Sequence, residues 1–279
     1  MKGKLYYLLV LFTAMATQSA CSSDKQLDNP EEKQWKVLFE DHFNKFDEKV
    51  WTKEVHEPGW VNQELQAYDK KHVSVGMDGD KSVLILTAER KGDLIYSGRV
   101  NSKGKKSFQY GKLEASIKLP KTANGLWPAF WMMGDNEKPW PRCGEIDIME
   151  MGNMEGIASG SSEKHVNTAI HYGENDGAGH HQEYKAVVCR NNLQDGEYHT
   201  YSLEWNETSL KVSVDDVDLH TFDISKNSGR YGYFHDKFYI LFNLAVGGAF
   251  TGITDPEAIT ALQDGEKVNM YVDWVRILY

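Results

Sequence analysis

The sequence predicts an all-β protein, and three observations carry that prediction. Short runs of alternating apolar and polar residues recur along the chain, which is the period of a half-buried strand. Clusters of Gly, Asn and Asp separate these runs, as hairpin connections require. Only one stretch looks helical, a short turn over Asp255–Leu262 that Asp255 can cap and whose first position suits Pro256. Many antiparallel strands in roughly 240 residues predict a β-sandwich or barrel.

The predicted strands follow one another through most of the chain. The clearest is 110–119, where Leu113, Ala115 and Ile117 alternate with charged and polar neighbours, so that one face of the strand is apolar. The other predicted strands are 83–90, 200–205, 210–215, 238–246 and 270–278.

Composition narrows the class of protein before any motif is considered. A chain of 279 residues is long enough to bury a core without disulfides or metal. The 31 Lys and Arg against 41 Asp and Glu give a formal charge of −10, which argues against a nucleic-acid partner. The 8 Trp and 14 Tyr are more than packing usually needs, and flat aromatic rings suit sugar rings. The composition indicates an acidic, aromatic-rich globular domain.

The first twenty residues have the pattern of an export signal. Lys2 and Lys4 precede an apolar run over 5–16, which is too short to span a bilayer as a helix and fits the apolar region of a signal peptide. We therefore predict that residues 1–20 are a lipoprotein signal peptide, and that the polar residues 21–34 form a tether.

The segment Gln18-Ser19-Ala20-Cys21 resembles the lipobox of bacterial lipoproteins, in which the cysteine is lipidated and becomes the first mature residue. Gln18 stands where Leu is usual, and the alternative is ordinary signal cleavage near Ala20. A lipid on Cys21 predicts a protein anchored in the bacterial cell envelope, at the outer membrane, the cell surface or the periplasmic face.

Cys143 and Cys189 are the two remaining cysteines. One pair is no disulfide framework, and its spacing fits no zinc pattern. We expect two unlinked, partly buried thiols, although an oxidising compartment would allow them to pair.

Acidic side chains concentrate in Gly144–Gly152, where Glu145, Asp147 and Glu150 are interleaved with Ile and Met. Glu145 and Asp147 must share a face of a strand, whereas Glu150 falls on the opposite face of a regular one. A bulge at Ile148–Met149 would return Glu150 to the acidic face. A calcium site is the competing interpretation, but such sites usually lie in loops rather than strands. Three crowded acids cost stability, and a carboxyl pair is what retaining glycoside hydrolysis requires.

Further motifs accompany the acidic segment in a fixed order. They are Asn62-Gln63-Glu64-Leu65-Gln66-Ala67-Tyr68, Ser97-Gly98-Arg99-Val100, Gly125-Leu126-Trp127-Pro128-Ala129-Phe130-Trp131, His171-Tyr172-Gly173 and Asn243-Leu244-Ala245-Val246-Gly247-Gly248. With these motifs the sequence resembles glycoside hydrolase family 16, the laminarinase-like enzymes. The resemblance implies a jelly roll of two curved antiparallel sheets, like that of concanavalin A, for a catalytic domain at 35–279. It also leads us to expect the segments 110–119 and 145–150 together on the concave side.

The resemblance implies a catalytic role for each acid. Glu145 is expected to be the nucleophile, Asp147 its helper and Glu150 the general acid/base. Glu145 must be ionised to attack, while Glu150 must hold a proton for the leaving oxygen. The two neighbouring negative charges are expected to raise the pKa of Glu150.

The resemblance also implies a cleft in which aromatic rings stack on sugars and polar side chains bind sugar hydroxyls. Trp127 and Trp140 each lie beside a proline in a loop-like context, which favours a cleft role. Trp131 shares an apolar run and is as easily a core residue, Arg99 could instead form a surface ion pair, and His171 could be structural. The expected substrate-binding residues are Asn62, Arg99, Trp127, Trp131, Trp140 and His171.

No cofactor is expected to be required, but the family often binds a structural calcium on the convex side. Asp273, in Val272-Asp273-Trp274-Val275, matches the late acidic residue that the family uses for calcium. The usual acidic opening motif here reads Asp41-His42-Phe43, with His where Glu is common, which weakens that expectation.

The substrate stays open at this stage, because the catalytic segment specifies the reaction and not the sugar. We expect an endo-acting retaining hydrolase of β-1,3-glucan or mixed-linkage β-1,3/1,4-glucan. The alternatives are an endo-β-galactosidase for mucin glycans or other galactans, and a carbohydrate-binding module without catalysis. The expected partners are a polysaccharide and a lipid anchor, with no nucleic acid, and the domain is expected to be a monomer.

Overall fold

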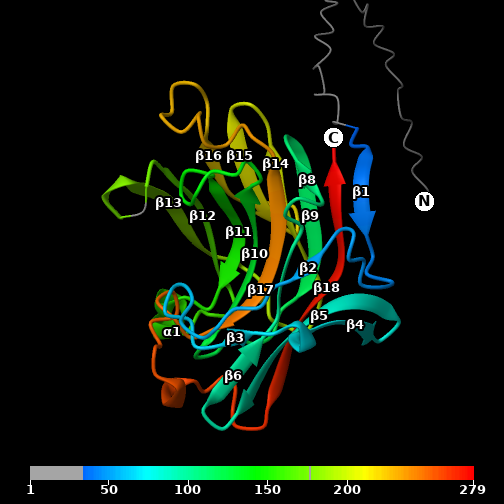
Figure 1. Ribbon diagram of the computed structural model, residues 1–279, viewed down its shortest axis with the longest axis vertical. Coiled ribbons are helices and arrows are strands. Elements are labelled where there is room, and N and C mark those ends of the chain that lie inside the picture. Colours follow the sequence, from blue (N-terminus) through cyan, green and yellow to red (C-terminus); the bar gives the residue numbers. More distant parts are fainter. Residues whose placement is uncertain (1–33, 176) are drawn as a thin grey trace, which may run out of the picture. The chain divides into compact units, whose positions relative to one another are not determined.

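The computed structural model describes residues 34–175 and 177–279, which form two sheets packed face to face (Figure 1). In the larger sheet the strand order is β16-β15-β14-β9-β18-β5-β6-β3, with β1 paired to β18 and β4 to β5. Its strands are β1 (Val37–Asp41), β3 (Ala67–Tyr68), β4 (Val73–Asp78), β5 (Lys81–Lys91), β6 (Leu94–Ser97), β9 (Gly111–Lys118), β14 (His199–Trp205), β15 (Ser209–Val214), β16 (Val217–Asp223) and β18 (Lys267–Leu278).

The smaller sheet carries the acidic segment, and its order is β13-β12-β11-β10-β17-β7-β2, with β8 paired to β17. Its strands are β2 (Thr52–Lys53), β7 (Arg99–Asn101), β8 (Ser107–Phe108), β10 (Leu126–Gly134), β11 (Glu145–Met151), β12 (His165–Gly173), β13 (His180–Val188) and β17 (Phe238–Val246). Nearly every pairing is antiparallel; β3 with β6 is parallel. The expected two-sheet, all-β architecture is confirmed.

The core lies between the two sheets and is rich in aromatic rings. Phe130 of β10 and Phe242 of β17 stack with ring centroids 4.8 Å apart. Trp205 of β14 meets Phe238 of β17 edge to face at 5.4 Å, which joins one sheet to the other. All four side chains are buried, and each contributes about 2 kcal/mol or more to folding through the apolar surface that it removes from water.

The six strands expected from alternation are all present, as β5, β9, β14, β15, β17 and β18. Strand β10 lacked this signal because both of its faces are apolar. One face packs in the core, and the other presents Trp127, Ala129 and Trp131 to the cleft described below.

One expectation about placement is wrong. The segment 110–119 does not share a sheet with 145–150, because β9 lies between β14 and β18 of the larger sheet. Alternation identifies which face of a strand is buried, but the sheet to which it belongs depends on pairing partners far along the chain.

The helical expectation is confirmed at its start, where Asp255 caps the turn and Pro256 occupies its first position, but it is wrong in its length. The stretch Asp255–Leu262 contains only a three-residue 3-10 turn, η3 (Pro256–Ala258), with Asp255 accepting a hydrogen bond from the Glu257 amide at 3.0 Å. The single α-helix among the described residues is instead α1 (Met154–Ser159), which is too short to show an apolar period. Asn153 caps its start and Gly160, at φ 66°, ends it. Two more 3-10 turns are η1 (Lys70–His72) and η2 (Gly177–Gly179).

Cys143 is buried, Cys189 is partly buried, and the two are not linked, which confirms the interpretation of unpaired thiols. The part of the chain that the structure describes contains no helix long and apolar enough to cross a membrane. The predicted signal peptide, Cys21 and the tether up to residue 33 lie outside the described residues.

Candidate active site

The predicted bulge is present in β11 and brings the three acids together. Asp147 pairs with Ala169 of β12 and Glu150 with Asn167, so three steps on β11 match two steps on its neighbour. The register with β10 shifts at the same place. The extra residue returns Glu150 to the face that Glu145 and Asp147 occupy, while the alternating Ile and Met side chains enter the core.

Each glutamate accepts a hydrogen bond from a tryptophan. The Trp140 indole N–H donates to Glu145 Oε2 at 3.1 Å, and the Trp127 indole N–H donates to Glu150 Oε1 at 2.9 Å. Each contact occupies one carboxyl oxygen and leaves the other without a bond to that tryptophan. The two tryptophans therefore fix the rotamers of the two glutamates as well as lining the site.

His171 contacts the other side of the acidic group. Its Nε2 lies 3.3 Å from Asp147 Oδ2 and 3.9 Å from Glu145 Oε1. Its Nδ1 lies 2.9 Å from Nε2 of His180, so one of these two ring nitrogens donates to the other. The structure therefore assigns His171 to the acidic centre rather than to a remote structural role.

Burial raises the pKa of all three acids, which extends the expectation made for Glu150 alone. Burial raises the pKa of Glu145 to about 8, and the nearby Asp147 carboxyl adds to the rise. Burial also raises the pKa of Asp147 to about 8. The pKa of Glu150 lies well above its ordinary value, because of burial first and the Asp147 charge second. Because the pKa values of Glu145 and Asp147 are about 8 and that of Glu150 is also raised, the protonated form of these carboxyls is favoured at neutral pH.

The acids line a cleft of about 920 Å³ on the outer face of the smaller sheet. It crosses the strands: β12 and β13 contribute to it on one side of β11, and β10, β17 and β7 on the other. All nine catalytic and substrate-binding residues expected from the sequence line this cleft, namely Asn62, Arg99, Trp127, Trp131, Trp140, Glu145, Asp147, Glu150 and His171.

Trp131 and Arg99 form one packed unit in the cleft wall. The Arg99 guanidinium lies 4.8 Å from the Trp131 ring centroid, and its Nε lies 3.1 Å from Glu54 Oε2. Arg99 is only 6% exposed, so its ion pair is buried rather than on the surface. The Trp131 indole N–H donates to Asn243 Oδ1 at 2.7 Å, which turns that ring away from the main core.

Asn62 has a left-handed backbone, at φ 53°, and its side-chain Nδ2 donates a hydrogen bond to Glu64 Oε1 at 3.3 Å. Glu64 is almost fully buried and also accepts hydrogen bonds from Gln66 Nε2 at 2.6 Å and the Tyr68 hydroxyl at 3.0 Å. The buried carboxylate thus fixes the loop that presents Asn62.

Several cleft residues were missed by the sequence reasoning. Trp60 is 47% exposed; its ring stacks on His56 at 3.5 Å and lies 5.3 Å from the Arg99 guanidinium. Its place beside the Asn62 motif was an available signal. The missed polar and aromatic lining residues are Glu54, His56, Trp60, Glu64, Asn101, Lys103, Tyr239, Asn243, Phe250, His180, Gln182 and Tyr184.

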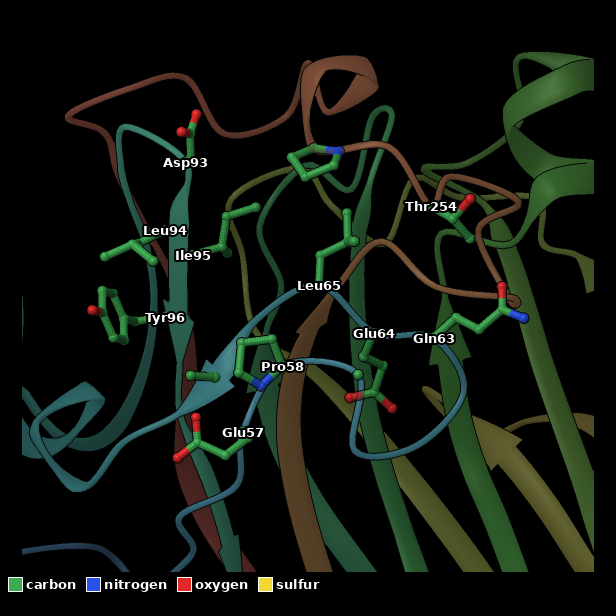
Figure 2. Close-up of a pocket in the computed structure, with 13 residues that line it drawn as sticks. Glu57, Pro58, Gln63, Glu64, Leu65, Asp93, Leu94, Ile95, Tyr96 and Thr254 are labelled. Carbon is green, nitrogen blue, oxygen red and sulfur yellow. The ribbon is translucent and has the colours of Figure 1, made fainter.

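A second depression, of about 650 Å³, lies behind the loop that carries Glu64 (Figure 2). Its lining includes Pro58, Leu65, Leu94 and Tyr96, with the carboxyls of Glu57 and Asp93 near its edge. None of the nine expected cleft residues lines it, so the reacting groups belong to the larger cleft.

The expected calcium ligand has another partner. Asp273 Oδ2 lies 2.7 Å from the Lys81 ammonium, which is where a cation would bind. Asp41 accepts hydrogen bonds from the Phe43 amide at 2.8 Å and the Trp51 indole at 2.9 Å. This donor set does not fit a calcium ion at Asp273, because a positive side chain already neutralises the carboxylate.

A cleft that crosses a β-sandwich and combines clustered carboxyls with aromatic rings defines a glycoside hydrolase. The chain belongs to the glycosyl hydrolases family 16, whose family model matches residues 60–276. This confirms the family that the motifs indicated.

Relatives of known structure or name cover most of the chain. A structure from the mixed linkage glucan PUL of Bacteroides ovatus, a family 16 protein in complex with a G4G4G3G product, is 72% identical with a TM-score of 0.84; the match covers 86% of this chain and 100% of that chain. The beta-glucanase of Rhodothermus marinus is 31% identical over 261 residues, covering 87% of this chain and 85% of that protein. The clotting factor G alpha subunit of Tachypleus tridentatus is 32% identical over 253 residues, and this chain spans 34% of its length.

Proposed function

We propose that this chain is a retaining, endo-acting glycoside hydrolase that cleaves internal β-linkages of mixed-linkage β-1,3/1,4-glucan or of β-1,3-glucan. The observation that carries the proposal is the bulge in β11, which places Glu145, Asp147 and Glu150 on one face of the cleft. The glucan substrate is supported by the 72% identity to the Bacteroides ovatus protein in complex with a glucan-type product.

The proposed reaction assigns one role to each acid. Glu145 attacks the anomeric carbon through the oxygen that does not accept the Trp140 bond. Glu150 protonates the leaving oxygen from Oε2, because Oε1 accepts from Trp127. Glu150 then removes a proton from water, which attacks the glycosyl-enzyme and releases a product of retained configuration. Asp147, between the two, sets how the trio shares its protons.

The proposed internal cleavage rests on the course of the cleft. Its lining extends to strands on both sides of β11, so a polymer can bind on both sides of the scissile bond. Trp60, Trp131 and Trp140 supply rings along that course. A polysaccharide with neutral hydroxyl groups suits this cleft better than one with sulfate or carboxylate groups, because several residues that line the cleft are acidic.

A substrate panel tests the proposal. Barley β-glucan and laminarin should release oligosaccharides of mixed length early in the reaction, whereas agarose, keratan and mucin should release few reducing ends. Preferential cleavage of keratan or mucin would support the endo-β-galactosidase alternative. Release of monosaccharide alone from chain ends would contradict internal cleavage. Glucan binding without new reducing ends would indicate a binding module.

We further propose a monomeric domain attached to the cell envelope through a lipid on Cys21, on the basis of the N-terminal sequence. Cys21→Ala should move the protein from the membrane fraction to the soluble fraction, and unchanged fractionation would contradict the anchor.

The proposed activity needs no cofactor. A melting temperature measured in EDTA and in calcium tests the remaining metal question. With Lys81 beside Asp273, we expect no shift between the two conditions. A rise in calcium that Asp273→Asn abolishes would establish a calcium site.

A further inference from the structure

Strand β13 forms one edge of the smaller sheet and presents a row of side chains to the cleft that the proposed reaction does not use. Strand alternation places His180, Gln182 and Tyr184 on the same face, and all three line the cleft. His180 contacts His171, which lies at the acidic centre. Tyr184 is the aromatic ring of this row with no role so far.

The Tyr184 ring is accessible, but its hydroxyl is held in place. The side chain is 39% exposed. Its hydroxyl donates to Asn167 Oδ1 and accepts from Asn153 Nδ2, the latter at 3.1 Å. Because both asparagines are buried, the hydroxyl is anchored while the ring remains open to the cleft. An aromatic ring fixed in this way can bind a ligand without losing further rotamer entropy.

The same contacts place Tyr184 beside the acid/base. Asn167 pairs with Glu150 in the sheet, and its amide donates to the Glu150 backbone carbonyl at 3.3 Å. Tyr184 pairs with Ala169, which in turn pairs with Asp147. Two strand spacings, about 9.6 Å, thus separate the backbones of Asp147 and Tyr184. The residue between them in this row is an alanine, so no bulky side chain of β12 separates the ring from the acids.

The position of the acid/base determines which sugar this ring can meet. Glu150 donates its proton to the leaving oxygen, so the sugar that departs must lie next to Glu150. Trp127 is also next to Glu150, but its ring stacks on Phe250 at 4.6 Å and is only 8% exposed. Tyr184 is the more accessible ring on the β13 side of this carboxyl.

We propose that Tyr184 is the platform on which the leaving-group sugar stacks, and that the same platform binds an incoming acceptor sugar. The proposal rests on the proposed retaining mechanism. In the acceptor reaction, the acceptor hydroxyl oxygen bonds to the anomeric carbon, the bond from that carbon to Glu145 breaks, and the hydroxyl proton passes to Glu150. Stacking by Tyr184 favours a sugar over water as the group that attacks, so this residue sets the ratio of transfer to hydrolysis.

A β-oligoglucosyl fluoride tests the proposal, because fluoride leaves without occupying the sugar platform. Fluoride release in buffer reports glycosyl-enzyme formation and hydrolysis. Lengthened products in the presence of an added gluco-oligosaccharide report transfer. Tyr184→Ala should lower the transfer-to-hydrolysis ratio about tenfold. Tyr184→Phe keeps the ring but loses its two anchoring hydrogen bonds, so its transfer ratio should lie between those of wild type and Tyr184→Ala.

Tyr231→Ala is the matched control. Tyr231 is 40% exposed, but it lies outside the cleft, against His235. We expect its transfer ratio to equal that of wild type. A wild-type ratio in Tyr184→Ala would overturn the platform, and so would an equal loss of transfer and fluoride release together with a lowered melting temperature. Wild-type protein that neither releases fluoride nor cuts glucan would overturn the proposed function, and this inference with it.

Discussion

The buried carboxyl of Glu145, the proposed nucleophile, should lower the stability of this domain in a way that depends on pH. Burial raises the pKa of Glu145 from 4.5 to about 8. Between these two values the folded state retains a proton that the unfolded state has lost, so stability falls as pH rises through this window. At pH 7 the loss amounts to about 3 kcal/mol, from about 1.4 kcal/mol for each pH unit above 4.5.

Glu145→Gln removes this loss, because the amide stays neutral and its carbonyl can still accept the Trp140 hydrogen bond. The variant should be inactive yet more stable than wild type by about 3 kcal/mol at pH 7, with almost no gain at pH 4. Urea unfolding at a series of pH values from 4 to 8 measures the gain directly.

Glu197→Gln controls for a change of net charge, since Glu197 is exposed and is not among the residues that line the cleft. It should leave the dependence of stability on pH almost unchanged. The reasoning would be refuted if Glu145→Gln were no more stable than wild type at pH 7. A gain of the same size at every pH would refute it equally, because that gain could not come from ionisation.

The remaining predictions concern the chemistry of the three acids. Glu150→Ala should still form a glycosyl-enzyme from an activated aryl glycoside, and added azide should return a β-glycosyl azide. In Glu145→Ala, azide should enter from the vacated side and give the α-product; an α-azide from the Glu150 variant would reverse the two assignments. Asp147→Asn should lower kcat on barley β-glucan less than either alanine variant does, and steady-state rates measure this difference. A loss of kcat as large as that of Glu145→Ala would instead assign Asp147 a direct role in the reaction. Trp127→Phe removes the hydrogen bond that lowers the pKa of Glu150. The alkaline limb of the kcat–pH profile should therefore move to higher pH. If the limb does not move, Glu150 is not the acid that titrates there.

The clearest strand prediction from the sequence came from the alternation of apolar and polar residues. In β9 this alternation arises because Leu113, Ala115 and Ile117 enter the core, whereas the opposite face carries the Lys112–Glu114 ion pair. In β11 the interleaving of acids with Ile and Met indicated the strand, whereas in β10 the second face lines the cleft with aromatic rings, so alternation could not identify that strand. Pairing partners were beyond the sequence, which is why 110–119 was expected on the wrong sheet.

The candidate site could be predicted to the extent that its residues lie in motifs. Every catalytic and substrate-binding residue expected from the sequence lines the cleft. Most contacts of these residues were not predictable, because they join residues far apart in the sequence. Trp127 with Glu150 and Arg99 with Glu54 are examples. Tyr184 had no motif around it, and only its hydrogen bonds to Asn153 and Asn167 reveal a fixed ring beside the acid/base.

The sequence by itself determined the all-β class, the bulge and the identity of the three acids. All three depend on the local spacing of residues. The bulge, for example, follows from the spacing of the acids, because Glu150 can share a face with Glu145 and Asp147 only if the strand contains one extra residue between them. Only the tertiary structure determined the pKa values of the three acids and which aromatic residues lie on each side of the cleft. Burial in the finished sandwich raises the pKa of all three acids, including the nucleophile that the sequence led us to expect ionised. The order of the strands places the Tyr184 ring on the β13 side of Glu150 and the rings of Trp127 and Trp131 on the β10 side. Desolvation and strand order are properties of the whole fold, so neither can be derived from a local stretch of sequence.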